Sequence, residues 1–270
     1  MKRMKKFMSV LSLIVMAFVC ALAFTGCGAT DEFARAESAT IEEIEESLDA
    51  RTEVGLGNGF DMTLTTNMNI MGVKLSVNAR IKILFEGTSV TKAIFIMSMS
   101  GHGESLKIYA YVKDEKLYTR TTGKEGGHKI DTKYVSDFDG DFGMGSEYDV
   151  DGLKEQLQDA IDKIIDTLTN SPTEVLEAMG LKKIVDEEND TARFQIKADY
   201  TETDAETGEL VKLGSYTFVL GFEGNELVEI SASTKMSGIN ISTKIRTLSE
   251  IADSEYPSGA ELAKYVSSTL

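Results

Sequence analysis

Residues 73–85 read VKLSVNARIKILF, and every second residue of this stretch is apolar. The apolar positions are Val73, Leu75, Val77, Ala79, Ile81, Ile83 and Phe85. Successive side chains of a β-strand point to opposite faces, so a period of two places all of these residues on one side. The stretch therefore predicts a long strand with one apolar face.

The same alternation recurs before and after this stretch. It is found at 62–70, 106–113, 193–200, 216–222, 227–236 and 239–245, while AIFIMSMS at 93–100 is apolar on both faces. Turn-forming residues at 69–72, 114–115 and 223–225 separate these stretches. Strands joined by short turns form antiparallel meanders, which commonly keep one face in water.

Four other segments have the apolar spacing of helices. They are SATIEEIEESL at 38–48, a stripe over 153–168, SPTEVLEAMG at 171–180 and the tail ELAKYVSST at 261–269. In the first of them, Thr40 and Glu43 fit the capping-box pattern. An apolar sheet face must be covered, and helices with one apolar stripe can cover it. We therefore expect an α+β fold, a curved antiparallel sheet (an unclosed half-barrel) of roughly eight to ten strands covered on its concave face by helices.

The N-terminus has the three parts of a secretory signal peptide. Residues 1–6 contain four basic residues, 7–24 are largely apolar, and Phe24-Thr25-Gly26-Cys27 follows. The last four residues resemble the lipobox of bacterial lipoproteins, with Phe24 in place of the usual Leu. This resemblance implies that Cys27 carries a diacylglyceryl group and becomes the first mature residue. An uncleaved membrane anchor is the alternative interpretation, since the apolar run is near the lower length limit for a span.

These features give a domain plan. We expect a lipoprotein signal peptide over 1–26, a tether over 27–37 and a single domain over 38–270, with a helical insertion at about 150–180. Without residues 1–26 the chain has 24 basic and 44 acidic residues, a net charge of −20. Such a charge disfavours nucleic acid as a partner. Cys20 leaves with the signal peptide and Cys27 is the lipid site, so no disulfide is expected within one mature chain.

A further resemblance comes from residues 106–131, LKIYAYVKDEKLYTRTTGKEGGHKID. Together with the lipobox and the order of strands and helices, this stretch resembles uncharacterised lipoproteins of Gram-positive bacteria. Through them it is similar to the LolA-like and LppX/LprG-like half-barrel proteins. The resemblance implies an unclosed barrel whose concave face holds acyl chains or lipid-anchored clients. It implies no catalytic residue and no cofactor.

The chemistry-bearing residues do not form a known motif. Asp137, Asp139 and Asp141 are spaced like the first calcium ligands of an EF-hand, but Phe142 stands at the glycine position and Glu147 comes one residue early. Whether the acidic loop 137–151 binds calcium stays open, and a solvated loop is the interpretation we adopt. His102 and His128 lie in separate glycine-rich turns, which does not match a zinc motif. No catalytic site is expected, and the protein is not expected to be an enzyme.

Methionine is frequent among the expected strands. Met62, Met68, Met71, Met97, Met99 and Met236 lie there, and Met179 lies in an expected helix. Methionine fills irregular gaps in cores, and it also recurs at adaptable apolar binding surfaces. Core packing is the simpler interpretation, and a lining for a lipid-shaped pocket is the other.

The sequence thus predicts a protein at the extracytoplasmic face of the cell membrane, held there by acylated Cys27. We expect it to bind or carry an apolar ligand, either a lipid or an acylated protein, in the half-barrel. The alternative is a cavity-free structural or protein-interaction module of the cell envelope. The sequence does not name a protein partner.

Overall fold

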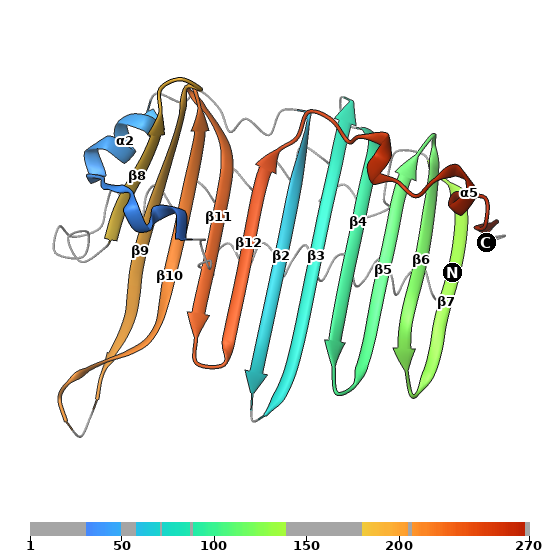
Figure 1. Cartoon of the computed structure of the whole chain (residues 1–270), viewed down its shortest axis with the longest axis horizontal. Coiled ribbons are helices and arrows are strands. Elements are labelled where there is room, and N and C mark those ends of the chain that lie inside the picture. Colours follow the sequence, from blue (N-terminus) through green and yellow to red (C-terminus); the bar gives the residue numbers. More distant parts are fainter. Residues whose placement is uncertain are drawn as a thin grey trace.

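The computed structural model describes residues 31–49, 58–70, 72–86, 89–138, 180–204 and 207–267. In these residues one open sheet of thirteen strands dominates the fold (Figure 1). The strand order is β1-β8-β9-β10-β11-β12-β2-β3-β4-β5-β6-β7-β13. The two outermost strands, β1 and β13, do not pair with each other, so the sheet is not closed into a barrel.

Two antiparallel meanders make up most of the sheet. The first contains β2 (Gly59–Ile70), β3 (Val73–Glu86), β4 (Ser89–Gly101), β5 (Glu104–Lys113), β6 (Lys116–Glu125) and β7 (His128–Asp137). The second contains β8 (Gly180–Asp186), β9 (Thr191–Thr203), β10 (Leu210–Glu223), β11 (Glu226–Met236) and β12 (Ile239–Thr247). They join side by side through β12 and β2, which pair antiparallel from Ile239 opposite Met68 to Thr247 opposite Phe60. The last strand of the second meander therefore extends the first.

The predicted hairpins are confirmed where the turn chemistry was clearest. Asp114 and Glu115 between β5 and β6 have φ of 51° and 56°. Two positive φ values in a two-residue loop match the twist of the flanking strands. The predicted turn at 69–72 also stands, because β2 ends at Ile70 and β3 begins at Val73.

The sheet presents two chemically different faces. We call one the apolar face; it carries the alternating side chains that the sequence grouped together. Its members include Phe60, Met62, Leu64, Ala79, Ile81, Phe95, Met97, Ile108, Ala110, Phe194, Ile196, Leu220, Phe222, Ile230, Ala232 and Ile245. The polar face carries the intervening side chains, among them Asp61, Lys74, Ser76, Arg80, Lys82, Ser98, Lys107, Arg193, Glu229, Ser231, Lys235, Lys244 and Arg246.

The N-terminal segment contacts both faces of the sheet beside β8. The 3-10 helix η1 (Asp31–Arg35) lies on the polar face, where the backbone oxygen of Phe33 accepts a 2.6 Å hydrogen bond from Lys182. β1 (Glu37–Ser38) then pairs with β8. The helix α2 (Ile41–Asp49) follows on the apolar face, where Ile44 packs with Phe194 and Leu220.

The capping box predicted for this helix is confirmed. The amide of Thr40 donates to Glu43 Oε2 at 2.9 Å, and the amide of Glu43 donates to Thr40 Oγ1 at 3.3 Å. The ammonium group of Lys183 on β8 also pairs with the Glu43 carboxylate. The helix start is therefore tied to the sheet edge.

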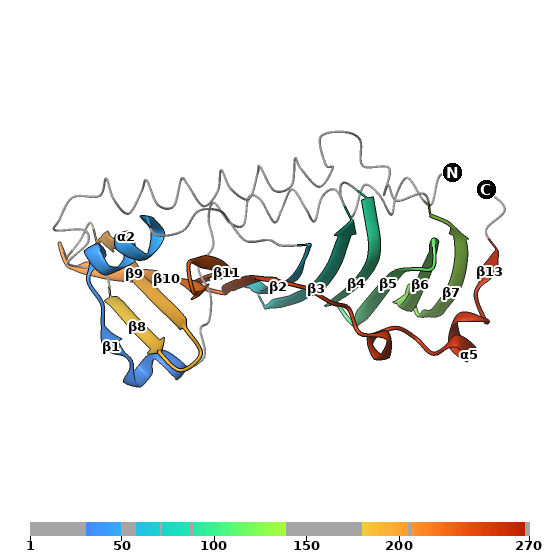
Figure 2. The same cartoon turned by 90° about the horizontal axis from the view of Figure 1, so that it is seen from above.

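The C-terminal segment runs along the polar face from the middle of the sheet to β7 (Figure 2). It contains the 3-10 helix η3 (Asp253–Glu255), the single-turn helix α5 (Gly259–Leu262) and β13 (Val266–Ser267), which pairs parallel with β7. Ile251 and Tyr256 are buried against Ile94 and Tyr111 of the sheet. The long outer strands β8 and β7 are thus each paired with a short strand from a terminal segment of the chain, β1 and β13.

The predicted α+β class, with helices covering the concave face, is wrong for the described residues. Their regular structure is nearly all strand, because the period of two continues through strands of up to 14 residues such as β3 and β10. The tail expected as a helix over 261–269 forms one turn and then a strand, since Val266 pairs with Tyr134 of β7. α2 covers only the β8–β11 end of the apolar face, and the expected helical insertion at about 150–180 lies outside the described residues except for Gly180 in β8.

Candidate ligand-binding face

The middle of the apolar face is fully buried. Met97 is 1% exposed and Ile245 2% exposed, and both belong to one cluster that extends from β12 across β2, β3 and β4 to β5. A second cluster joins α2 to β9, β10 and β11, with Phe194 and Phe222 in an edge-to-face contact. Burial on this scale makes the apolar face the largest source of stability in the sheet.

The burial decreases toward one end of the strands, where the β2–β3, β4–β5 and β11–β12 turns lie. We call this the turn end. A row of paired residues crosses the apolar face here: Met236 opposite Ile239, Ile239 opposite Met68, and Met68 opposite Leu75. Leu75 is 39% exposed and Met236 37% exposed. The apolar face therefore reaches solvent at the turn end.

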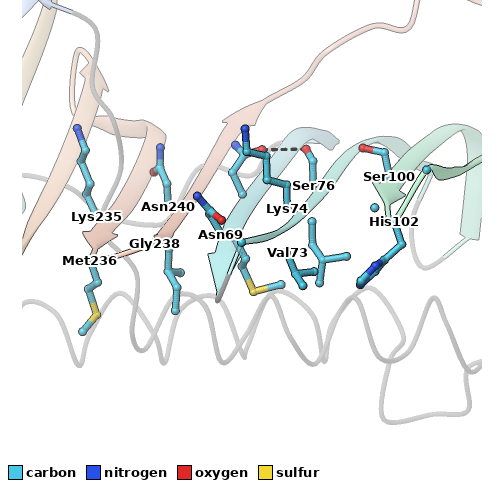
Figure 3. A pocket seen from close by; sticks show the side chains of 17 residues that line it. Asn69, Val73, Lys74, Ser76, Ser100, His102, Lys235, Met236, Gly238 and Asn240 are labelled. Carbon is cyan, nitrogen blue, oxygen red and sulfur yellow. Dashed lines mark hydrogen bonds between the residues drawn. The ribbon is translucent and has the colours of Figure 1, made fainter.

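A cavity of about 790 Å³ lies at the same end, and we call it the turn-end cavity (Figure 3). It is lined by Asn67, Met68, Asn69, Gly72, Val73, Lys74, Leu75, Ser76, Ser100, Gly101, His102, Gly103, Lys235, Met236, Gly238, Ile239 and Asn240. Figure 3 shows Lys74, Lys235 and Asn240 directed to one side of the sheet and Met236 to the other. The cavity thus adjoins both the exposed end of the apolar face and a group of polar side chains.

All five methionines described within the strands point to the apolar face. They are Met62, Met68, Met97, Met99 and Met236, and the register of β2, β3, β4, β11 and β12 places them together. Met62 and Met97 belong to the buried centre, whereas Met68 and Met236 line the turn-end cavity. Core packing thus applies to Met62 and Met97, whereas a lipid-binding role for Met68 and Met236 stays a prediction. Met71 and Met179 lie outside the described residues.

The polar face is organised around a buried carboxylate. Glu229, whose side chain is 7% exposed, accepts hydrogen bonds from Arg193 at 3.0 Å and from Arg246 at 2.8 Å, and pairs with Lys244 at 2.7 Å. Burial alone would raise the pKa of Glu229, but the hydrogen bond from Lys244 and the charges of Lys244, Arg193 and Arg246 hold it below its ordinary value. Glu229 is therefore ionised at neutral pH.

A glycine makes this arrangement possible. Arg193 on β9 and Glu229 on β11 both lie opposite Gly221 of the intervening strand β10. A Cβ atom at Gly221 would lie 3.0 Å from the Cβ of Glu229, so the absent side chain leaves room for the Arg193 guanidinium.

The residues singled out from the sequence are not brought together. Cys27, Asp139, Asp141 and Glu147 lie outside the described residues, and Asp137 is the last residue of β7. His102 lies in the β4–β5 turn and lines the turn-end cavity, whereas His128 begins β7. Within the described ranges, no three His, Cys, Asp or Glu side chains are grouped closely enough to hold a metal ion.

Sequence reasoning missed the polar residues of the turn-end cavity. They come from three separate turns, at 67–76, 100–103 and 235–240, and no single turn has a sequence that indicates a binding site. The strand order alone brings them side by side. Among the described helices, none has the length and apolar character needed to cross a bilayer.

Comparison with known proteins leaves the family open. No protein-family model and no curated protein match the chain. A solved domain assigned to outer-membrane lipoprotein sorting, from Vibrio parahaemolyticus, is 11% identical with a TM-score of 0.21 and covers 80% of this chain and 95% of its own. A DUF1329 family protein from Desulfovibrio piger ATCC 29098 is 8% identical with a TM-score of 0.19 and covers 82% of this chain and 96% of its own. Similarity at this level shows no shared ligand or activity, and the LolA-like assignment stays a prediction.

Proposed function

We propose that this chain is a membrane-anchored, extracytoplasmic lipoprotein that holds an apolar ligand, a lipid or an acylated protein, on the apolar face of its sheet. It acts by binding, not by catalysis. The observation that carries the proposal is the row Met236, Ile239, Met68 and Leu75, in which a buried apolar surface continues to solvent. Flexible methionine side chains can adapt to acyl chains of different length.

The anchoring part of the proposal rests on the sequence around Cys27. Acyl chains contribute about 0.8 kcal/mol for each buried methylene group, so two or three long chains hold a protein on a bilayer. Metabolic labelling with an alkyne-tagged fatty acid is expected to mark the wild-type chain and not a Cys27→Ser variant. An unlabelled wild type, or a Cys27→Ser variant that is still processed and membrane-bound, would reject the anchor.

The ligand is tested on the purified full chain with a fluorescent acyl probe and by mass spectrometry of an organic extract. We expect saturable probe binding that a Leu75→Gln/Met236→Gln double variant weakens about fivefold, because both changes place amides in the solvent-exposed part of the apolar face. Lys107→Gln/Lys124→Gln, two exposed positions on the polar face, serves as the matched control. An extract without ligand together with no probe binding would reject the proposal.

The alternative, a cavity-free protein-interaction module, is favoured by the complete burial of Met97 and Ile245 in the middle of the apolar face. It differs from the first proposal in its expected partner. Crosslinking in intact cells would then recover a defined protein, and the acyl probe would not bind.

A further inference from the structure

The turn-end cavity has a polar side as well as an apolar one. Lys74, Ser76 and Asn67 come from the β2–β3 hairpin, Ser100 from β4, and Lys235 and Asn240 from the β11–β12 hairpin. Figure 3 shows the two lysines on the same side of the sheet, with Asn240 between them and with Ser76 and Ser100 beyond Lys74. The polar side of the cavity therefore carries two cationic groups together with amides and hydroxyls.

The charge at this place is opposite to that of the chain. The protein has a net charge of −16, yet none of the 17 described residues that line the cavity is an aspartate or glutamate. Four other lysines of the polar face are neutralised: Lys82 pairs with Glu255, Lys113 with Asp253, Lys133 with Glu261 and Lys244 with Glu229. Lys74 and Lys235 have no such partner among the residues that the structure describes. The cavity therefore attracts anions.

The polar groups near Lys74 are held in place. Asn78 donates to Ser76 Oγ at 3.3 Å, and the Ser76 hydroxyl donates to Asn67 Oδ1 at 2.8 Å. This chain of hydrogen bonds fixes the Asn67 amide with its NH₂ group available as a donor. A ligand therefore meets donors whose orientation is already set.

The cavity wall is also fixed by backbone contacts. The amide of Asn69 donates to the backbone oxygen of Gly238 at 2.5 Å, which ties the β11–β12 turn to the end of β2. Gly238 has φ of 74°, and a Cβ atom there would lie 2.4 Å from the Asn69 oxygen. Only glycine permits this close approach. The two hairpins that carry Lys74 and Lys235 are thus held next to each other.

We propose that the turn-end cavity binds a phosphate group carried by a small polyol or sugar, with glycerol phosphate as the simplest example. Lysine binds phosphate as a point charge, so Lys74, which lies beside Ser76 on β3, attracts the phosphate oxygens, and Lys235, three strands away on β11, adds to the positive potential. The amide of Asn67 and the hydroxyls of Ser76 and Ser100 can pair with the hydroxyl groups of the ligand. A cavity of about 790 Å³ lies within the range of small-molecule sites. The inference does not depend on the apolar-ligand function proposed above.

The test is calorimetric titration of the full chain, purified in a neutral detergent, with glycerol phosphate, inorganic phosphate and glycerol. In a second arm the chain is sedimented with phosphatidylcholine vesicles that contain or lack phosphatidylglycerol. The two arms distinguish a free ligand from a lipid headgroup. The variants are Lys74→Ala/Lys235→Ala and, as a control with the same loss of charge, Lys116→Ala/Lys129→Ala, two exposed lysines elsewhere on the polar face.

We expect saturable binding in at least one arm, none to glycerol, and weaker binding at high salt because the lysines are exposed. Lys74→Ala/Lys235→Ala is expected to lower the affinity about tenfold, whereas Lys116→Ala/Lys129→Ala leaves it unchanged. An equal loss of affinity in both variants would mean that the ligand is attracted nonspecifically by positive charge, and it would overturn the proposal. Binding that survives Lys74→Ala/Lys235→Ala, or no binding in either arm, would overturn it as well.

Discussion

The apolar and polar faces are made by the same strands, yet they depend on different forces. In the middle of the apolar face, Met97 and Ile245 are buried in a cluster whose described members are all apolar. On the polar face, buried positions such as Glu229 and Lys82 exist only with partners of opposite charge. The comparison shows that Glu229 and Lys82, two buried charged residues of this sheet, each have a counter-charge, supplied by other strands or by the C-terminal segment.

The two faces also differ in what covers them. The C-terminal segment lies at the end of the strands opposite the turn end (Figure 1), and it contacts the polar face through Ile251, Tyr256 and the Lys82–Glu255 pair. On the apolar face the described cover is α2 alone, which reaches only the second meander. Substitutions on the two faces should therefore change the free energy of unfolding by different amounts and with different dependence on pH.

The largest effect is expected in the middle of the apolar face. Met97→Ala removes a side chain that is 1% exposed and leaves a cavity between β3, β4 and β5. Truncations of this kind lower the free energy of unfolding by about 2–5 kcal/mol. Ser98→Ala, the next residue on the polar face, is the control and should change it by less than about 0.5 kcal/mol. Urea denaturation measures both, and equal effects would contradict the assignment of the two faces.

A smaller loss is expected from the centre of the polar face. Glu229→Ala leaves Arg193, Lys244 and Arg246 close together without their shared carboxylate. Because these cations are partly exposed, solvent screens part of their repulsion, and we expect a loss of about 1–3 kcal/mol in the free energy of unfolding. Glu226→Ala on the same strand, an exposed position, should be close to neutral. A Glu229→Ala protein as stable as wild type would mean that the network contributes nothing.

The same carboxylate gives the polar face a pH dependence that the apolar face lacks. The pKa of Glu229 is held below 4.5, its ordinary value, so its ionised form favours folding at pH values above 4.5. As the pH falls below 4.5 through the lowered pKa, this contribution is lost. The difference in stability between wild type and Glu229→Gln should therefore narrow in acid, while that between wild type and Met97→Ala should not. A constant difference for Glu229→Gln would contradict the lowered pKa.

The apolar and polar faces of the sheet could be predicted from the sequence far better than the segments that cover them. The alternation at 73–85 predicts the strand and the residues on its apolar side, because a period of two can be recognised from neighbouring residues alone. The position of β12 beside β2 could not be obtained in this way, since no local signal reports which strand edges meet. The turn-end cavity depends on that pairing, and its lysines were therefore missed. The apolar spacing of the tail from Glu261 is short and fits a helix as well as a strand, and the pairing with β7 decides its structure.

The smallest effect is expected where the C-terminal segment meets the polar face. The ring of Tyr256 is buried, 6.3 Å from the ring of Tyr111, and the Lys113 ammonium lies 5.1 Å from its centroid. Its hydroxyl is also buried and has no hydrogen-bond partner among the described residues, and burial raises the pKa of Tyr256. Tyr256→Phe keeps both ring contacts and removes an unsatisfied polar group, so the free energy of unfolding should stay the same or rise by up to about 1 kcal/mol. A clear loss of stability on urea denaturation would show that the hydroxyl is bonded in solution, and that the C-terminal segment is held by hydrogen bonds as well as by rings and charges.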